Sequence, residues 1–254
     1  MAAMTGLVLL LWAGVTVASQ VDLHKRIYGG RDCLHDERPH HVDLTSTSDP
    51  DYFCGGTLIS NQWVLTAAHC HEPGETIIAH LGNPRRQYTI TDKKKLTKWF
   101  FIKHDIMLLK LPDTVPDPFA ALPTDCSGHP PNGEEVTVSG LSTTIRNGKI
   151  TERLAADEQK PLQCVELEVV PCSCPISSSY EYPNIFCYKG AGKGTNPGDS
   201  GSGVMYGGTL YGVHVAGIIE NCNANSAAVK VCEKIYLDWI NKIINDNGCV
   251  GCIG

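Results

Sequence analysis

From residue 27 onward the sequence is a succession of short apolar runs, each interrupted by Gly, Pro, Asn or Asp. Runs of this length, at intervals of this kind, are typical of strands joined by turns. We therefore expect an all-β architecture, either a sandwich or a barrel. The runs that carry this prediction are Thr57–Ile59, Trp63–Thr66, Thr76–Leu81, Ile106–Leu111, Val136–Val138 and Tyr211–Ile219.

Two segments of the chain differ from this pattern. Residues 111–123 contain four prolines near the middle of the chain, and such a stretch can join two lobes. Residues 232–247 instead repeat their apolar side chains at helical spacing, and Gly248 follows as a stop signal. We expect an amphipathic C-terminal helix over 232–247, whose role is packing rather than binding.

The first residues have the composition of a targeting segment. Leu7 to Val17 is apolar, and Val17-Ala18-Ser19 supplies small residues at a cleavage site. The apolar run is too short to span a bilayer, so we interpret residues 1–19 as a secretory signal peptide. This interpretation predicts a secreted, extracellular protein without a membrane segment.

Cysteine content and charge narrow the class of protein further. Twelve cysteines behind such a leader predict disulfides formed in an oxidising compartment. Zinc binding is the competing interpretation, but the cysteines are scattered, and the one Cys-x2-Cys pair is Cys249 with Cys252. The formal net charge of −6 argues against a nucleic-acid partner. The one basic run, residues 93–95, fits a solvated loop or a patch that steers substrate or heparin.

Three motifs supply a base, a carboxylate and a nucleophile in that order along the chain. They are Thr66-Ala67-Ala68-His69-Cys70, Asp105-Ile106-Met107-Leu108-Leu109 and Gly198-Asp199-Ser200-Gly201. A serine hydroxyl is a weak nucleophile that needs a base, and the base needs a group that fixes its tautomer. Each motif alone has an ordinary structural explanation. Their joint occurrence in this order predicts nucleophilic catalysis by Ser200, His69 and Asp105.

With these motifs the chain resembles the trypsin/chymotrypsin family of serine proteases, from Ile27 to about Asn247. Further matching pieces are Ile27-Tyr28-Gly29-Gly30, Cys54-Gly55-Gly56-Thr57-Leu58 and Asp238-Trp239-Ile240. The resemblance implies two six-stranded antiparallel β-barrels with the active site between them. The lobes would span roughly 27–120 and 121–231, followed by the C-terminal helix.

The resemblance also implies a role for each matched residue. Ser200 would attack the scissile carbonyl, with His69 as base and Asp105 as its partner, while the backbone N–H groups of Gly198 and Ser200 would form the oxyanion hole. Residues 20–26 would be an activation propeptide, removed by cleavage between Arg26 and Ile27, after which the new amino group would pair with Asp199. The expected partners are a protein or peptide substrate, an activating protease and protein protease inhibitors. We expect a monomer with no cofactor and no metal.

The resemblance assigns eight of the twelve cysteines to pairs. It implies bridges Cys33–Cys164, Cys54–Cys70, Cys126–Cys232 and Cys174–Cys187. Cys172, Cys222, Cys249 and Cys252 stay unassigned, and one completion is Cys172–Cys222 with Cys249–Cys252.

The residues expected to line the substrate side-chain pocket depart from the family. Gly194 stands where trypsin has an aspartate, so cleavage after Arg or Lys is disfavoured. We expect an uncharged residue before the scissile bond (P1), either medium apolar or aromatic. His214, behind the pocket, is either structural or a pH-sensitive element. The expected substrate-binding set is Gly194, Thr195, Val215, Ala216, Gly217 and Ser226.

Two functional hypotheses follow from these residues. The first is an active secreted serine endopeptidase made as a zymogen, supported by the complete set of catalytic motifs. The second is a weakly active or inactive serine-protease homologue that acts as a binding protein. It is supported by the altered pocket, in which Val215 lacks a hydroxyl and Ala216 lacks an indole that the family usually has.

Overall fold

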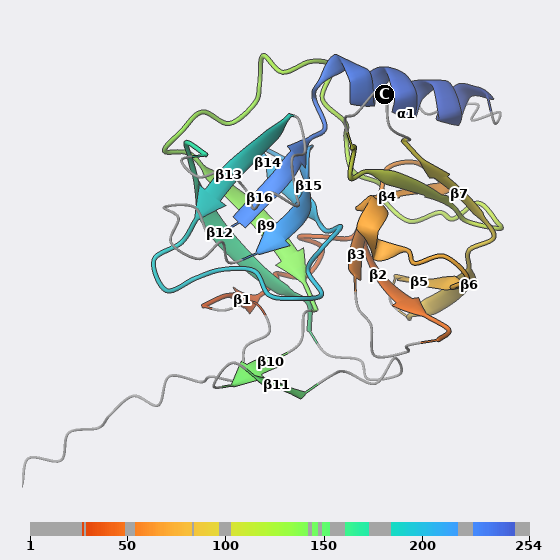
Figure 1. Cartoon of the computed structure of the whole chain (residues 1–254), viewed down its shortest axis with the longest axis horizontal. Helices are drawn as coiled ribbons and strands as arrows, with labels where there is room; N and C mark the ends of the chain where they lie inside the picture. The colour runs from red at the N-terminus through yellow and green to blue at the C-terminus, as the bar shows by residue number, and fades with distance from the viewer. Residues whose placement is uncertain are drawn as a thin grey trace, which may run out of the picture.

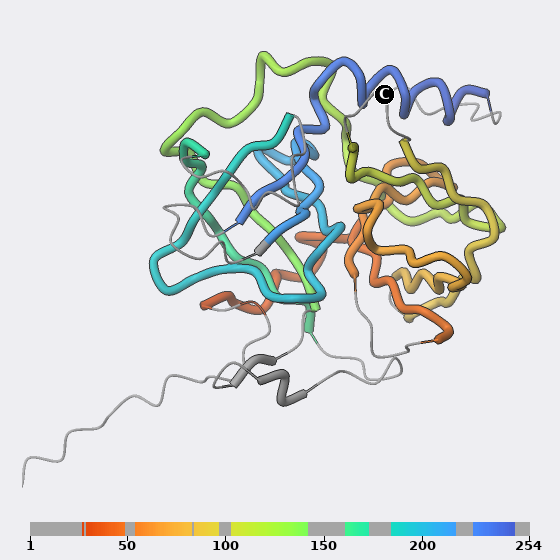
Figure 2. Tube along the Cα trace, in the orientation of Figure 1, coloured from red at the N-terminus to blue at the C-terminus, as the bar shows by residue number. Residues whose placement is uncertain are grey.

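The computed structural model describes residues 27, 29–48, 54–82, 84–96, 103–141, 144–146, 149–152, 161–172, 184–217 and 226–246. Within them the chain forms two antiparallel β-lobes side by side and one helix (Figures 1 and 2). The expected all-β fold is thereby confirmed. The signal-peptide and propeptide predictions, with Arg26 and Cys174, Cys222, Cys249 and Cys252, lie outside the described residues.

The N-terminal lobe is a curled half-barrel rather than a closed ring in the residues described. Its sheet has the order β6-β5-β2-β3-β4-β8-β7, and all neighbouring strands are antiparallel. All residues of β3 and β4 are buried, because these central strands carry apolar or small side chains on both faces. The strands are β2 (His41–Ser46), β3 (Cys54–Leu58), β4 (Trp63–Thr66), β5 (Ile77–Leu81), β6 (Arg86–Thr89), β7 (Asp92–Lys95) and β8 (Met107–Lys110).

The C-terminal lobe closes into a six-stranded barrel. The order β12-β13-β16-β15-β14-β9 is completed by pairing between β9 and β12, and the short β1 (Arg31–Asp32) is added outside β12. The first described residues therefore belong to the C-terminal lobe. The strands are β9 (Glu135–Gly140), β12 (Gln163–Val170), β13 (Ile185–Lys189), β14 (Gly203–Tyr206), β15 (Thr209–Gly217) and β16 (Ser226–Lys230). A separate two-stranded ribbon pairs β10 (Thr144–Arg146) with β11 (Lys149–Glu152).

The expected C-terminal helix is α1 (Lys234–Asp246). Its buried side chains are Tyr236, Leu237, Ile240 and Ile244, and they share one hydrophobic core with Trp63 of the N-terminal lobe. Figure 1 shows α1 lying across that lobe although the helix directly follows the last strand of the other one. The helix therefore ties the two lobes together by packing. No helix in the described part of the chain is long and apolar enough to cross a membrane.

Four disulfides connect the described residues. Cys33–Cys164, Cys54–Cys70 and Cys126–Cys232 form as the resemblance implied. The fourth implied pair is wrong, because Cys187 is bonded to Cys172 and not to Cys174. Val170 is the Cα partner of Cys187 in the β12–β13 ladder, so Cys172 leaves the strand end beside Cys187, with 5.2 Å between the Cα atoms. The alternative pair Cys172–Cys222 is excluded by the same bond.

Candidate active site

His69 is held by the carboxylate of Asp105 at two points. Asp105, just before β8, accepts a hydrogen bond from the His69 backbone N–H at 2.9 Å and from His69 Nδ1 at 2.7 Å. The Asp105 side chain is 2% exposed and that of His69 is 32% exposed. Because the carboxylate engages Nδ1–H, the neutral ring carries its lone pair at Nε2. His69 is therefore fixed in the tautomer that a general base needs.

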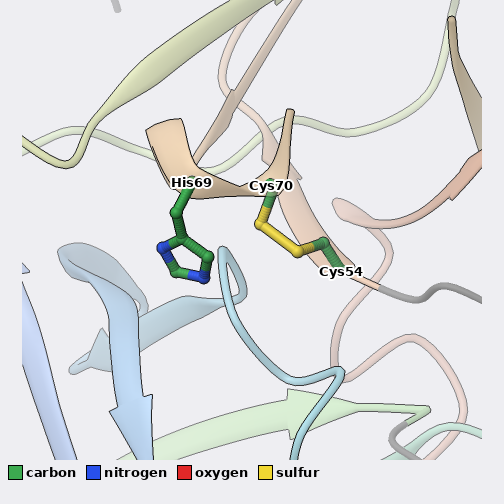
Figure 3. Close-up of side chains that lie close together, drawn as sticks. All are labelled: Cys54, His69 and Cys70. Carbon is green, nitrogen blue, oxygen red and sulfur yellow. A yellow bond between two sulfur atoms is a disulfide. The ribbon is translucent and has the colours of Figure 1, made fainter. Parts of the chain in front are cut away.

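The short 3-10 helix η1 (Ala68–Cys70) carries His69 and is anchored to β3 by the Cys54–Cys70 disulfide. Figure 3 shows the imidazole and this disulfide leaving η1 in different directions. The three side chains are close enough together to suggest a metal site. Both sulfur atoms are consumed by the disulfide, however, so they offer no thiolate for metal binding. The cluster is a structural anchor for His69.

The segment that carries Ser200 is fixed by main-chain hydrogen bonds on both sides. The Ser200 carbonyl accepts from Gly55 N at 2.7 Å, which docks the segment on β3. Gly201 N donates to the His214 carbonyl at 2.7 Å, and His214 N donates to the Ser202 carbonyl at 2.9 Å, which docks it on β15. Ser200 therefore lies where the two lobes meet. Its carbonyl oxygen is also 3.6 Å from Cys70 Sγ, beside η1.

Two glycines make this arrangement possible. Gly198 has φ +103° and Gly201 has φ +85°, a region that other residues rarely adopt. A Cβ atom on Gly201 would also overlap the Thr66 hydroxyl and the Gly55 carbonyl. The chain can therefore turn tightly on either side of Asp199 and Ser200 while it lies against the N-terminal lobe.

Asp199 and Ile27 both lie inside the C-terminal lobe. The Asp199 side chain is fully buried, and its Oδ2 accepts from Asn196 N at 2.8 Å. A Cβ on Gly140 would overlap the Asp199 carboxylate, so glycine at that position leaves its space. The Ile27 side chain is also fully buried, in the core formed by β9 and β12. Arg26, the other half of the expected cleavage site, lies outside the described residues.

The residues of the expected substrate pocket are buried rather than open. Thr195 and Ser226 are 1% and 0% exposed, and their hydroxyl oxygens are 2.9 Å apart. Gly194 and Val215 are also buried, and Ala216 is half-buried. Gly217 is the Cα partner of Ser226, which places the ends of β15 and β16 side by side. The structure therefore brings the predicted pocket residues together, and the hydrogen bond between Thr195 and Ser226 lies buried among them.

Tyr188 is a buried residue of this region that the sequence analysis missed. Its hydroxyl lies 2.6 Å from Nδ1 of His214, and both side chains are almost completely buried. Burial, with the nearby His69, lowers the pKa of His214 to about 3, and burial raises the pKa of Tyr188 well above its usual value. His214 is thus neutral near pH 7, which supports the structural alternative over the pH-sensitive one. No spacing rule in the sequence links positions 188 and 214.

The serine at position 202 has a buried hydroxyl with no hydrogen-bond partner among the described residues. It lies against Gly55 so closely that a Cβ on Gly55 would overlap the hydroxyl oxygen. Gly55 therefore has two roles at this contact. Its N–H binds the Ser200 carbonyl, and its missing side chain leaves room for Ser202.

Comparisons with known proteins agree on one family. The family model described as Trypsin matches residues 27–240. Human putative trypsin-6 is 32% identical over 266 residues, covering 96% of this chain and 100% of that protein. Chicken trypsin I-P1 is 32% identical and covers 95% and 99% of the two chains. Among solved structures, mouse neuropsin, a serine protease expressed in the limbic system of the brain, superposes with a TM-score of 0.68 at 23% identity, over 85% of this chain and 99% of its own.

Proposed function

The chain belongs to the trypsin family of serine proteases, and we propose that it is a secreted serine endopeptidase in which Ser200, His69 and Asp105 hydrolyse peptide bonds. The observation that carries the proposal is the pair of hydrogen bonds that His69 donates to the Asp105 carboxylate, which fixes the tautomer of the base. The docking of the Ser200 segment on both lobes supports it further.

Each step of the proposed reaction uses a group at this site. His69 Nε2 takes the proton of the Ser200 hydroxyl as Oγ bonds to the scissile carbonyl carbon. The carbonyl electron pair moves to its oxygen, where the backbone N–H groups of Gly198 and Ser200 donate. The imidazolium then protonates the leaving amine, and an acyl-enzyme remains. A water molecule then attacks the acyl-enzyme through the same steps, with His69 again as base, and the carboxylic acid product is released.

We also propose that the protein is made with a signal peptide at 1–19 and as a zymogen. Cleavage after Arg26, by a protease that prefers basic residues, would free the amino group of Ile27 to pair with Asp199. The complete burial of both side chains in one lobe supports this, because a buried carboxylate is stabilised by a cationic partner. Four disulfides fit an extracellular location. Protein substrates and protein protease inhibitors are the proposed partners of a monomer.

A second candidate function is that of a serine-protease homologue with little or no activity that binds a partner. The almost complete burial of Thr195 and Ser226 favours it, because a substrate side chain needs an open pocket. Val215 and Ala216, which lack the usual hydroxyl and indole, favour it as well.

A fluorophosphonate probe distinguishes the two candidates. We expect protein cleaved after Arg26 to be labelled at Ser200, and the uncleaved chain to be labelled much more slowly. Ser200→Ala provides the control for labelling elsewhere. If correctly cleaved and folded protein is not labelled, the endopeptidase proposal is wrong and the binding protein is favoured.

A further inference from the structure

The inner end of the proposed P1 pocket is sealed by two hydroxyl groups. Thr195, in the segment before Ser200, and Ser226, at the start of β16, are 2.9 Å apart between Oγ1 and Oγ. Solvent reaches 1% of Thr195 and none of Ser226. If a deep pocket extended past these residues, their side chains would line it and be accessible. We therefore take the Thr195–Ser226 pair as the floor that a P1 side chain would meet.

Tyr188 lies directly behind this floor. Tyr188 on β13 and Gly217 on β15 are both Cα partners of Ser226 on β16, so the three residues form a row across neighbouring strands. Side chains at paired positions share one face of a sheet. Tyr188 is 0% exposed, and its ring therefore occupies barrel interior beside Ser226.

The small side chains of β16 allow Tyr188 to reach His214. Ala228 is the Cα partner of both Phe186 on β13 and His214 on β15, so the positions of β16 that lie between Tyr188 and His214 carry the small side chains of Ser226 and Ala228. The Tyr188 hydroxyl crosses β16 to within 2.6 Å of His214 Nδ1. Two large polar side chains thereby fill the space that the small residues leave.

The Tyr188 hydroxyl and His214 Nδ1 pair with each other, which holds both side chains in place. The Tyr188 hydroxyl and Nδ1 of the neutral His214 ring form one hydrogen bond, in which the ring tautomer decides which of the two atoms donates. Moving Tyr188 would leave the buried His214 Nδ1 without this partner. The backbone of His214 also binds Gly201 and Ser202, so the filling is joined to the nucleophile segment.

We propose that the Tyr188–His214 pair, with Thr195 and Ser226 before it, restricts P1 to small uncharged residues such as Ala, Ser and Gly. This inference rests on the proposed endopeptidase function. Aromatic side chains are excluded by volume. Arg and Lys are excluded because the floor offers hydroxyl groups and no carboxylate. The preference is narrower than the medium apolar or aromatic P1 expected from the sequence.

A peptide library with all residues at P1 tests the preference, using protein cleaved after Arg26. We expect kcat/KM for Ala at P1 to exceed that for Phe and for Arg at least tenfold. The double variant Ser226→Gly/Tyr188→Ala removes the floor and the ring behind it. The ratio of kcat/KM for Phe at P1 to kcat/KM for Ala at P1 should then rise at least tenfold. Tyr188→Phe is the matched control, because it keeps the ring and should leave this ratio within threefold of wild type.

The outcomes separate this inference from the proposed function. Labelled wild-type enzyme that prefers Phe or Arg at P1 overturns the inference and leaves the endopeptidase intact. Cleaved protein that no probe labels refutes the endopeptidase itself.

Closure of the pocket is also measured without catalysis. In the Ser200→Ala protein, toluene and benzamidine should give no saturable rise in the thermal unfolding temperature. In Ser200→Ala/Tyr188→Ala toluene should give one, because the lost ring leaves an apolar cavity. A saturable rise in Ser200→Ala alone would mean that the pocket is open, and the inference would then be wrong even if the Tyr188→Ala protein failed to fold.

Discussion

The corner that holds His69 and the inner end of the P1 pocket are built in different ways. His69 is held by a carboxylate and by a disulfide that fastens its short helix to β3. The pocket is closed by hydrogen bonds between side chains, Thr195 with Ser226 and Tyr188 with His214. The second arrangement does not involve the Asp105 carboxylate, so substrate choice can change while the geometry of His69 stays.

The largest effect should come from the His69 corner. Asp105→Asn would place an amide where the carboxylate accepts from Nδ1, favouring the wrong tautomer of His69. We expect kcat to fall by about 10⁴-fold, the order found for this change in a Ser-His-Asp triad, with little change in P1 preference. Steady-state kinetics on two peptides that differ only at P1 would measure both. A shift in P1 preference of similar size would contradict the separation of the two regions.

Asp199→Ala tests the connection between the regions. Asp199 is buried beside Gly140, and its proposed partner is the amino group freed at Ile27. Removing one member of a buried ion pair costs about 3–5 kcal/mol, so activity should be lost although Ser200, His69 and Asp105 remain. The rate of fluorophosphonate labelling after cleavage is the measurement. Wild-type labelling in this variant would refute the proposed activation step.

Acidification should weaken both lobes through buried histidines, among them His80 in the N-terminal lobe and His214 in the C-terminal lobe. Burial lowers the pKa of His80 to about 4 and that of His214 to about 3, below the value of about 6.5 in an unfolded chain. At a pH between the folded and the unfolded pKa of each histidine, the unfolded chain binds more protons than the folded chain. The stability from each histidine is therefore fully present above pH 6.5. As the pH decreases below 6.5, the free energy of unfolding falls by about 1.4 kcal/mol per pH unit for each histidine.

Urea unfolding of the oxidised protein at pH 7 and pH 4.5 measures this loss. His80→Gln and His214→Gln should each reduce the difference between the two pH values. If both variants keep the wild-type difference, these histidines are not the groups that take up protons on unfolding.

The smallest effect is expected at two buried serines. Within the described part of the chain the Ser202 hydroxyl has no hydrogen-bond partner, whereas Ser60 Oγ accepts from Trp63 N at 3.2 Å, and both residues are 0% exposed. Ser202→Ala should leave the free energy of unfolding unchanged or raise it by about 1 kcal/mol, while Ser60→Ala should lower it by about 1 kcal/mol. Equal losses in urea unfolding would show that Ser202 has a partner.

The sequence predicted the His69 corner better than the pocket. Strand content, the C-terminal helix and three disulfides follow from local patterns and from the family resemblance. Pairing of Cys172 with Cys187 could not be predicted, because Cys172 and Cys174 stand only two positions apart and the β12–β13 register places Cys172 beside Cys187. Tyr188 was missed for a similar reason, since its partner His214 lies on a strand that is not its neighbour.

By itself, the sequence determined that the chain forms short strands, carries a base, a carboxylate and a serine in family order, and lacks an acidic residue at position 194. These are properties of composition, spacing and motif, which do not depend on how strands pair. Only the tertiary structure decided which strands meet, that the C-terminal ring closes and the N-terminal sheet curls, and that Tyr188 fills the barrel behind Ser226. The physical reason is strand register. Side chains that are far apart in the sequence become neighbours only when the residue-by-residue pairing of their strands is fixed.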